Sequence, residues 1–124
     1  FAILNINRTS TGAIISEHPI DFNLVNSIIY GNLSEGELGT DLNSAANISA
    51  ANNLIRTTLP EFSVNNNITD MDPLFVNVNT YDYALDSLSP AQDKGLTLNP
   101  PITDDLCDEA RDANPDMGAL ESKF

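Results

Sequence analysis

The chain has 124 residues, 41% of them hydrophobic, which is enough for one domain to bury a core without disulfides or a structural metal. Its 18 Asp and Glu residues outnumber 5 Lys and Arg residues, and the formal net charge is −13 at pH 7. A field of that sign repels nucleic acids, anionic lipids and acidic polysaccharides, so it excludes them and leaves neutral sugars, cations or basic protein surfaces as partners.

Short apolar segments along the chain predict β-strands. They lie at residues 2–4, 13–15, 24–25, 28–30, 53–55 and 74–76. None continues with a helical period for ten residues, and Gly, Pro and many Asn residues separate them, as in turns and left-handed backbone. The first segment follows Phe1 with no polar stretch before it, so we expect further strands of a parent protein to stack upstream.

The strands also repeat. Asn26-Ser27-Ile28-Ile29 recurs as Asn52-Asn53-Leu54-Ile55, and Asn65-Asn66-Asn67-Ile68 is a weaker third copy. The first spacing is that of one β-helix coil, roughly 20 to 30 residues. Stacked coils would align Ile on Ile and Asn on Asn, which fills the interior and lets amides hydrogen-bond between coils. The sequence therefore predicts an all-β fold, a right-handed parallel β-helix of few coils.

An antiparallel β-sandwich with Asn-rich turns is the alternative fold. The hairpin dipeptides Asn-Gly and Asp-Gly, which sandwiches commonly contain, do not occur in the chain. After Pro73, prolines interrupt any regular element. We expect coils over residues 1–95 and an irregular acidic capping tail over 96–124 in the same domain, covering the end of the strand stack.

Four ordered groups of motifs carry a resemblance to a known family. They are GAII at 12–15 with NSIIYGN at 26–32, DPLFV at 72–76 with YDYAL at 81–85, SPAQDKG at 89–95, and DLCDEAR at 105–111 with PDMGALE at 115–121. This arrangement resembles the C-terminal region of bacterial secreted parallel β-helix repeat proteins, of the choice-of-anchor type. The resemblance implies a secreted or cell-surface protein with upstream β-helix coils, but no particular activity, because members include lyases and adhesins.

The chain does not contain the residues that β-helix enzymes use. Hydrolases need paired carboxylates and lyases need a base beside a uronate, whereas His18 is the single histidine and the cations are scattered. We therefore predict a non-catalytic C-terminal capping module of an extracellular β-helix protein, serving cell-surface adhesion or polysaccharide binding. Its partner would be a neutral polysaccharide or a surface protein. The alternative is the distal part of a carbohydrate-active enzyme, a polysaccharide lyase or glycoside hydrolase, with its active site upstream.

Two groups of residues are candidates for specific roles. Tyr81 and Tyr83 alternate in a predicted strand, so their rings would share one face and form a sugar-stacking platform, or else pack the tail onto the last coil. Arg111 stands where the family's motif has an arginine. We expect it to be partly buried and to pair with one or more of three carboxylates, joining the 89–95 and 115–121 segments. The three carboxylates are those of Asp93, Asp116 and Glu121.

Calcium is the cofactor that the acidic residues suggest, through Asp70, Asp72 and the cluster at 104–112, although no calcium-binding loop spacing is present. No nucleic-acid partner is expected. No apolar run is long enough to span a bilayer, so we also expect no membrane insertion. The single cysteine, Cys107, lies among carboxylates that disfavour its thiolate.

Overall fold

The computed structural model describes residues 2–4, 6–17, 19–31, 39–41 and 46–123. Over these residues the fold is all-β, with short strands, two single-turn 3-10 helices and no α-helix. The strands are β1 (Ala2–Leu4), β2 (Ile6–Arg8), β3 (Ile14–Glu17), β4 (Ile20–Val25), β5 (Ile28–Ile29), β6 (Gly39–Asp41), β7 (Ala46–Ala51), β8 (Leu54–Ile55), β9 (Ile68–Thr69), β10 (Phe75–Asn77) and β11 (Asp82–Leu85). The 3-10 helices are η1 (Pro60–Phe62) and η2 (Val78–Thr80).

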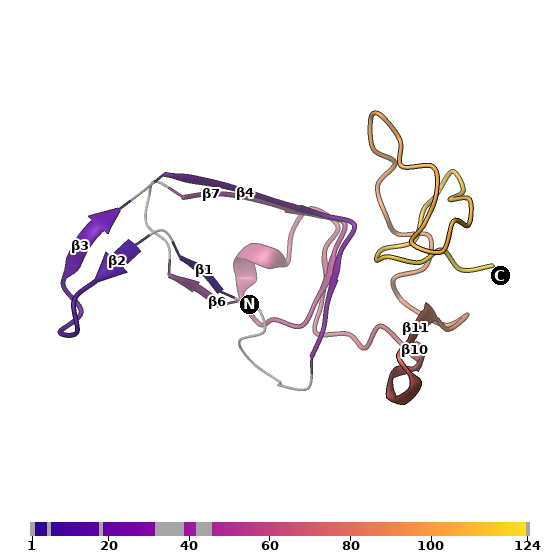
Figure 1. The fold of residues 1–124 in the computed structure, drawn as a ribbon, viewed down its shortest axis with the longest axis horizontal. Coiled ribbons are helices and arrows are strands. Elements are labelled where there is room, and N and C mark those ends of the chain that lie inside the picture. Colours follow the sequence, from indigo (N-terminus) through magenta and orange to yellow (C-terminus); the bar gives the residue numbers. More distant parts are fainter. Residues whose placement is uncertain (1, 5, 18, 32–38, 42–45, 124) are drawn as a thin grey trace.

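Parallel pairing dominates the N-terminal part of the fold. Among the described strands, β1 pairs with β6, β4 with β7, β5 with β8 and β8 with β9, all in parallel. Viewed as in Figure 1, β4 and β7 overlie each other and the chain turns sharply at their ends into β5 and β8. An antiparallel sandwich would not give these pairings. The two antiparallel pairs are the hairpins β2–β3 and β10–β11.

The register of the ladders corrects the third copy of the repeat. Ile28 lies opposite Leu54, and Leu54 lies opposite Ile68. The third copy is therefore Asn66-Asn67-Ile68-Thr69, one residue later than the sequence comparison placed it. The run of three asparagines at 65–67 made the two placements look alike in the sequence.

A buried asparagine holds the corner between β7 and β8. Asn53 is fully buried, and its Oδ1 accepts a hydrogen bond from the Ser27 N–H at 2.9 Å while its Nδ2 donates to the Leu24 carbonyl at 3.0 Å. Asn67 repeats this role one coil later, accepting from the Asn53 N–H at 3.0 Å and donating to the Ala50 carbonyl at 2.9 Å. Each amide thus satisfies the backbone of the coil before it.

The asparagines that precede these ladder positions have left-handed backbone. Asn26, Asn52 and Asn66 have φ values of 51°, 54° and 58°. Asparagine tolerates this conformation better than other residues with a side chain, because its short amide can hydrogen-bond locally. At Asn26 and Asn52 the conformation turns the chain through the corner between a long strand, β4 or β7, and the short strand that follows it.

Side chains along the short strands point alternately to the two faces of the strand stack, and they form two hydrophobic cores. Ile29 and Ile55 face the interior of the coils, with Ala50 and Phe62. Ile28 and Leu54 face the opposite way, because successive side chains of a strand point to opposite sides. They form the second core with residues from the rest of the chain, namely Leu85, Ala91 and Met117, flanked by Tyr30, Ile68 and Phe75.

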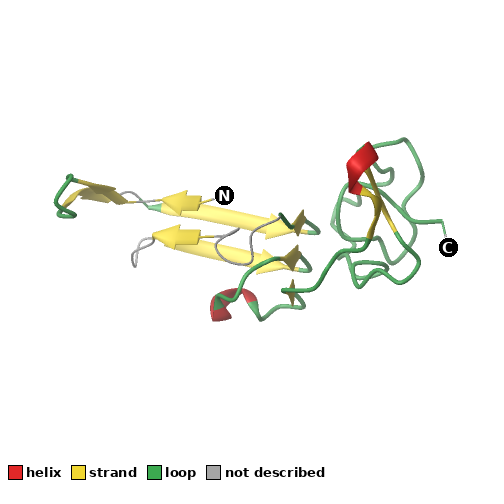
Figure 2. Ribbon diagram, turned by 90° about the horizontal axis from the view of Figure 1, so that it is seen from below, coloured by secondary structure: helices red, strands yellow, loops and turns green. Residues whose placement is uncertain are grey.

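The tail packs on the side of the strand stack, and the expectation that it covers the end of the stack is wrong. Met117 is buried against Leu54 in the second core, and Figure 2 shows the C-terminal region beside the strands. The segment with η1 lies at the edge of the stack beyond β7 (Figure 2), where Phe62 closes the interior core. The outward apolar face of β5, β8 and β9 explains the tail's position, because it would otherwise be exposed.

Among the described residues the last parallel strand is β9, which ends at Thr69, whereas we expected coils over residues 1–95. The tail is indeed irregular: beyond β11 its described residues contain only an isolated bridge between Asp104 and Ala110. Corner asparagines tie it to the coils. Asn26 and Leu96 exchange two hydrogen bonds, of 2.7 and 2.6 Å, and the Asn52 Nδ2 donates to the Lys94 carbonyl at 2.9 Å.

Replacing the ladder asparagine tests its structural role. Asn53→Ala should lower the free energy of unfolding by on the order of 3 kcal/mol, because several buried partners lose their hydrogen bonds at about 1–3 kcal/mol each. Asn47→Ala is the matched control, since the one partner of this exposed amide in the described part of the chain is Asp21, at 3.1 Å. It should change stability by no more than about 0.5 kcal/mol. Equal losses in urea unfolding would contradict the role of the ladder.

Candidate functional site

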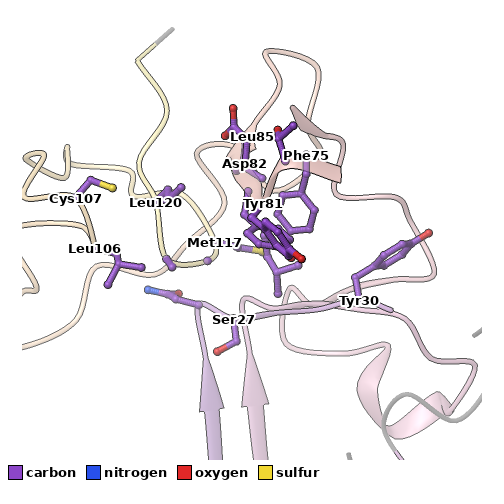
Figure 3. A pocket seen from close by; sticks show the side chains of 16 residues that line it. Ser27, Tyr30, Phe75, Tyr81, Asp82, Leu85, Leu106, Cys107, Met117 and Leu120 are labelled. Atoms are coloured by element: carbon purple, nitrogen blue, oxygen red, sulfur yellow. The ribbon is translucent and has the colours of Figure 1, made fainter. Parts of the chain in front are cut away.

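An open cleft of about 990 Å³ lies between the strand stack, the β10–β11 hairpin and the tail. Its lining comes from segments that are far apart in the sequence (Figure 3). The lining residues are Asn26, Ser27, Ile28, Tyr30, Phe75, Thr80, Tyr81, Asp82, Tyr83, Leu85, Leu106, Cys107, Met117, Gly118, Ala119 and Leu120. Several belong to the second core, so the packing of the tail on the stack also forms the cleft.

Both tyrosines that the sequence singled out line this cleft. The exposed fraction is 82% for Tyr81 and 49% for Tyr83. The Tyr83 ring meets the Phe75 ring edge to face, with centroids 5.4 Å apart and planes at 87°. Edge-to-face packing of this kind is favourable and fixes the ring. Tyr83 is therefore a half-buried, oriented wall residue, whereas most of Tyr81 is open to solvent.

The expectation that strand alternation sets the direction of both rings is wrong for Tyr81. Strand β11 begins at Asp82, and Tyr81 lies before it, as the residue that ends η2. Its backbone is left-handed, with φ 60° and ψ 26°, so strand alternation does not set the direction of its ring. An aromatic residue in this conformation is strained, and such strain is found preferentially at functional sites.

A third tyrosine, Tyr30, lines the cleft and was missed in the sequence. Its ring lies under the Arg56 guanidinium, whose carbon is 4.9 Å from the ring centroid. Arg56 also donates a hydrogen bond from Nη1 to the Gly31 carbonyl. Extending the repeat by one residue beyond Ile29 and Ile55 would have placed Tyr30 beside Arg56 in neighbouring coils.

The polar groups of the cleft are mostly used within the chain. The Asn26 amide binds the Leu96 backbone, the Ser27 hydroxyl donates to the Val25 carbonyl at 2.9 Å, and the Thr80 hydroxyl donates to the Asn77 carbonyl at 3.2 Å. Asp82 accepts from the Ala84 N–H through one carboxylate oxygen, at 3.2 Å. The other oxygen has no partner in the described part of the chain.

Arg111 forms a largely buried ion pair in the tail. Its Nη1 lies 3.0 Å from the Glu121 Oε2, and the two side chains are 12% and 7% exposed. The guanidinium also donates to the Asp116 and Gly118 carbonyls, at 3.3 and 2.9 Å. Of the three candidate carboxylates, the structure brings only that of Glu121 to the guanidinium.

Asp116 and Asp93 contact each other instead, through the carboxylate of Asp116 and the backbone N–H of Asp93. The buried Asp116 carboxylate accepts hydrogen bonds from the Asp93 N–H at 2.7 Å and from the Ser122 N–H at 2.6 Å. Backbone donors therefore occupy both of its oxygens. This carboxylate, together with a 2.7 Å bond from the Gly95 N–H to the Pro115 carbonyl, joins the 89–95 and 115–121 segments, a role that we had assigned to Arg111.

A second carboxylate, that of Asp105, organises the adjacent loop. It accepts backbone hydrogen bonds from Glu121 at 2.8 Å, Cys107 at 2.7 Å and Glu109 at 3.0 Å. These bonds, first that from Glu121 and then that from Glu109, lower the pKa of Asp105 below its ordinary value of 3.8. They stabilise the charged form of the carboxylate.

No group of three or more His, Cys, Asp or Glu side chains is arranged to hold a metal ion among the described residues. Calcium binding therefore stays a prediction without a located site. Cys107 is an exposed free thiol at the cleft, and His18 lies outside the described residues. No helix in the described part of the chain is long and apolar enough to cross a bilayer.

Removal of the buried cation should destabilise the tail. Arg111→Ala removes the cation from the largely buried Glu121 carboxylate, which keeps only the backbone N–H donors of Asp112 and Asp116 in the described part of the chain, and breaking a buried pair typically costs about 3 to 5 kcal/mol. The control is Lys123→Ala, which breaks the exposed pair between Lys123 and Glu109 at 2.7 Å and should change the melting temperature little. Similar melting temperatures for the two variants would show that the Arg111 pair contributes no more than a surface pair.

The lowered pKa of Asp105 predicts a loss of stability in acid. Because the folded pKa lies below 3.8, the charged carboxylate stabilises the fold above that pH, and the stabilisation disappears as the pH falls through the folded pKa. Asp105→Asn should therefore be less stable than wild type at neutral pH and should lose less on acidification. Asp108→Asn is the control, in the same loop. Parallel pH profiles for wild type and Asp105→Asn in urea unfolding would contradict the assignment.

Comparison with protein-family models, curated proteins and solved structures finds no match to this chain. The resemblance to secreted β-helix proteins therefore rests on the sequence motifs.

Proposed function

We propose that the chain is a non-catalytic C-terminal module of a secreted or cell-surface protein, built as a right-handed parallel β-helix, and that it serves adhesion by binding a polysaccharide. The parallel ladders with a repeated register support the β-helix. Among the described strands, β4 pairs only with β7 and β5 only with β8. Upstream coils of the parent chain would extend both ladders, so they are the partner that we propose for this edge.

Tyr81 is the observation that carries the binding proposal. It exposes 82% of its surface in the cleft and has a strained left-handed backbone. A large apolar ring held in an unfavourable conformation is better explained by ligand contact than by stability. Its flat face can stack on the apolar face of a sugar ring. The net charge of −13 favours a polysaccharide without acidic groups, or a surface protein that displays one.

The chemistry of the cleft favours binding over catalysis. Among its lining residues Asp82 is the one carboxylate, and none is Lys, Arg or His. Glycoside hydrolysis needs two carboxyl groups flanking the scissile bond, and elimination needs a base. An enzyme would therefore need a different site. In the alternative function, the parent protein is a carbohydrate-active enzyme, and its active site lies on upstream coils.

Tyr81→Gly separates binding from stability. Glycine accepts the left-handed backbone without strain, so the variant should be at least as stable as wild type in thermal unfolding. Loss of the ring should weaken polysaccharide binding at least about tenfold, or about 1.4 kcal/mol, as measured by calorimetry on hits from a glycan array.

Leu74→Gly is the matched control. Leu74 is also left-handed, with φ 54°, but it does not line the cleft, so this variant should bind like wild type. Undiminished binding by Tyr81→Gly, or the absence of any glycan hit for the wild-type protein, would overturn the proposal.

A further inference from the structure

We infer that the cleft takes a polymer of N-acetylated amino sugars, whose acetyl methyl groups contact its apolar lining. This inference rests on the proposed polysaccharide-binding function and adds the chemical class of the ligand. It starts from the composition of the lining, in which aliphatic and aromatic side chains predominate. The aromatic surface suits any sugar ring, whereas the aliphatic surface suits a sugar that carries an apolar substituent.

Leu106 is the most exposed aliphatic residue of the cleft. Its side chain is 79% exposed, while its backbone is held by a 2.9 Å hydrogen bond from its N–H to the Ala119 carbonyl. Figure 3 shows Leu106 and Leu120, both from the tail, to one side of Tyr81. A single exposed leucine is ordinary, but exposed apolar side chains that gather in one cleft mark a binding surface.

An unsubstituted sugar would leave the aliphatic part of this surface uncovered. The C–H face of a pyranose stacks on an aromatic ring such as that of Tyr81, but the rim of the sugar consists of hydroxyl groups. An acetyl methyl group adds apolar surface that an aliphatic side chain can cover. Because the ligand is a polymer, one sugar can stack on Tyr81 while the acetyl group of another lies against Leu106, so no single group has to reach both.

The polar groups of the cleft favour an uncharged substituent. The side chains of Asn26, Ser27 and Thr80 are engaged in bonds within the chain, and the Asp82 carboxylate lies on the side of the hairpin away from the tyrosine rings (Figure 3). No basic residue is among the described residues that line the cleft, and the net charge of −13 repels anions. Tyrosine hydroxyls remain as donors, and an amide carbonyl is a strong acceptor for them.

Calorimetry with β-1,4-linked tetrasaccharides of one backbone tests the inference. The tetramers are those of glucose, N-formylglucosamine and N-acetylglucosamine. The formylated tetramer keeps the amide and lacks only the methyl group, so it isolates the apolar contact from hydrogen bonding. The acetylated tetramer should bind at least about fourfold more tightly than either of the others, the ratio expected when one methyl group is buried.

Leu106→Ala should remove most of this preference, because it deletes the aliphatic surface that the methyl group covers. Leu88→Ala is the matched control, since Leu88 is 80% exposed but does not line the cleft, and this variant should keep the wild-type ratio. Thermal unfolding should give both variants nearly the wild-type melting temperature, because both side chains are largely solvated.

The outcomes separate the inference from the function on which it rests. Equal or tighter binding of the glucose or the formylated tetramer would overturn the acetylated ligand and leave polysaccharide binding intact. A wild-type preference in Leu106→Ala would overturn the inference in the same way, as would failure of all tetramers when the glycan array gives other hits. Failure of the tetramers and of the array together would overturn both.

Discussion

The fold depends on one kind of interaction, the reach of a buried asparagine from one coil to the backbone of the coil before it. A polar side chain in a protein interior is costly unless every group finds a partner. Asn53 meets this condition by binding Ser27 and Leu24 of one coil and Asn67 of another. The corner is thereby fixed, and the short strands that follow it are held in register. The direction of their side chains, inward or outward, follows from that register.

The site is a consequence of the same register. Once Ile29 and Ile55 face inward, Ile28 and Leu54 must face outward, and the apolar strip that they form has to be covered. The hairpin and the irregular tail cover it incompletely, and the uncovered remainder is the aromatic cleft. The proposed binding surface is therefore continuous with the second core, with Met117 on the buried side and Tyr81 on the open side.

The sequence predicted the parts of this structure that depend on local chemistry. The strands, the asparagine corners and the irregular tail follow from residue type and spacing. The position of the tail did not follow, because a proline-rich acidic segment suits an end cap or a side cover equally well. It is decided by the outward face of Leu54, which is visible only once the register is known. Tyr81 was found for the wrong reason, since its backbone departs from the strand that the YDYAL pattern indicated. Arg111 pairs with Glu121, one of its three expected partners, but the link between the 89–95 and 115–121 segments comes from Asp116, because sequence does not distinguish a carboxylate that binds backbone from one that binds a cation.

The polarity of the asparagine ladder bears on how the protein is made. Each corner is completed by the side chain of the coil that follows it in the chain: Asn53 closes the corner at Ser27, and Asn67 closes the one at Asn53. The corner at Ser27 therefore stays open until the segment with Asn53 has been synthesised and has folded onto it. Folding of the ladder is then ordered along the chain, because each segment completes the corner of the one before it. The covering tail follows the same order, since its Leu96 and Lys94 carbonyls bind the amides of Asn26 and Asn52 only after both corners exist.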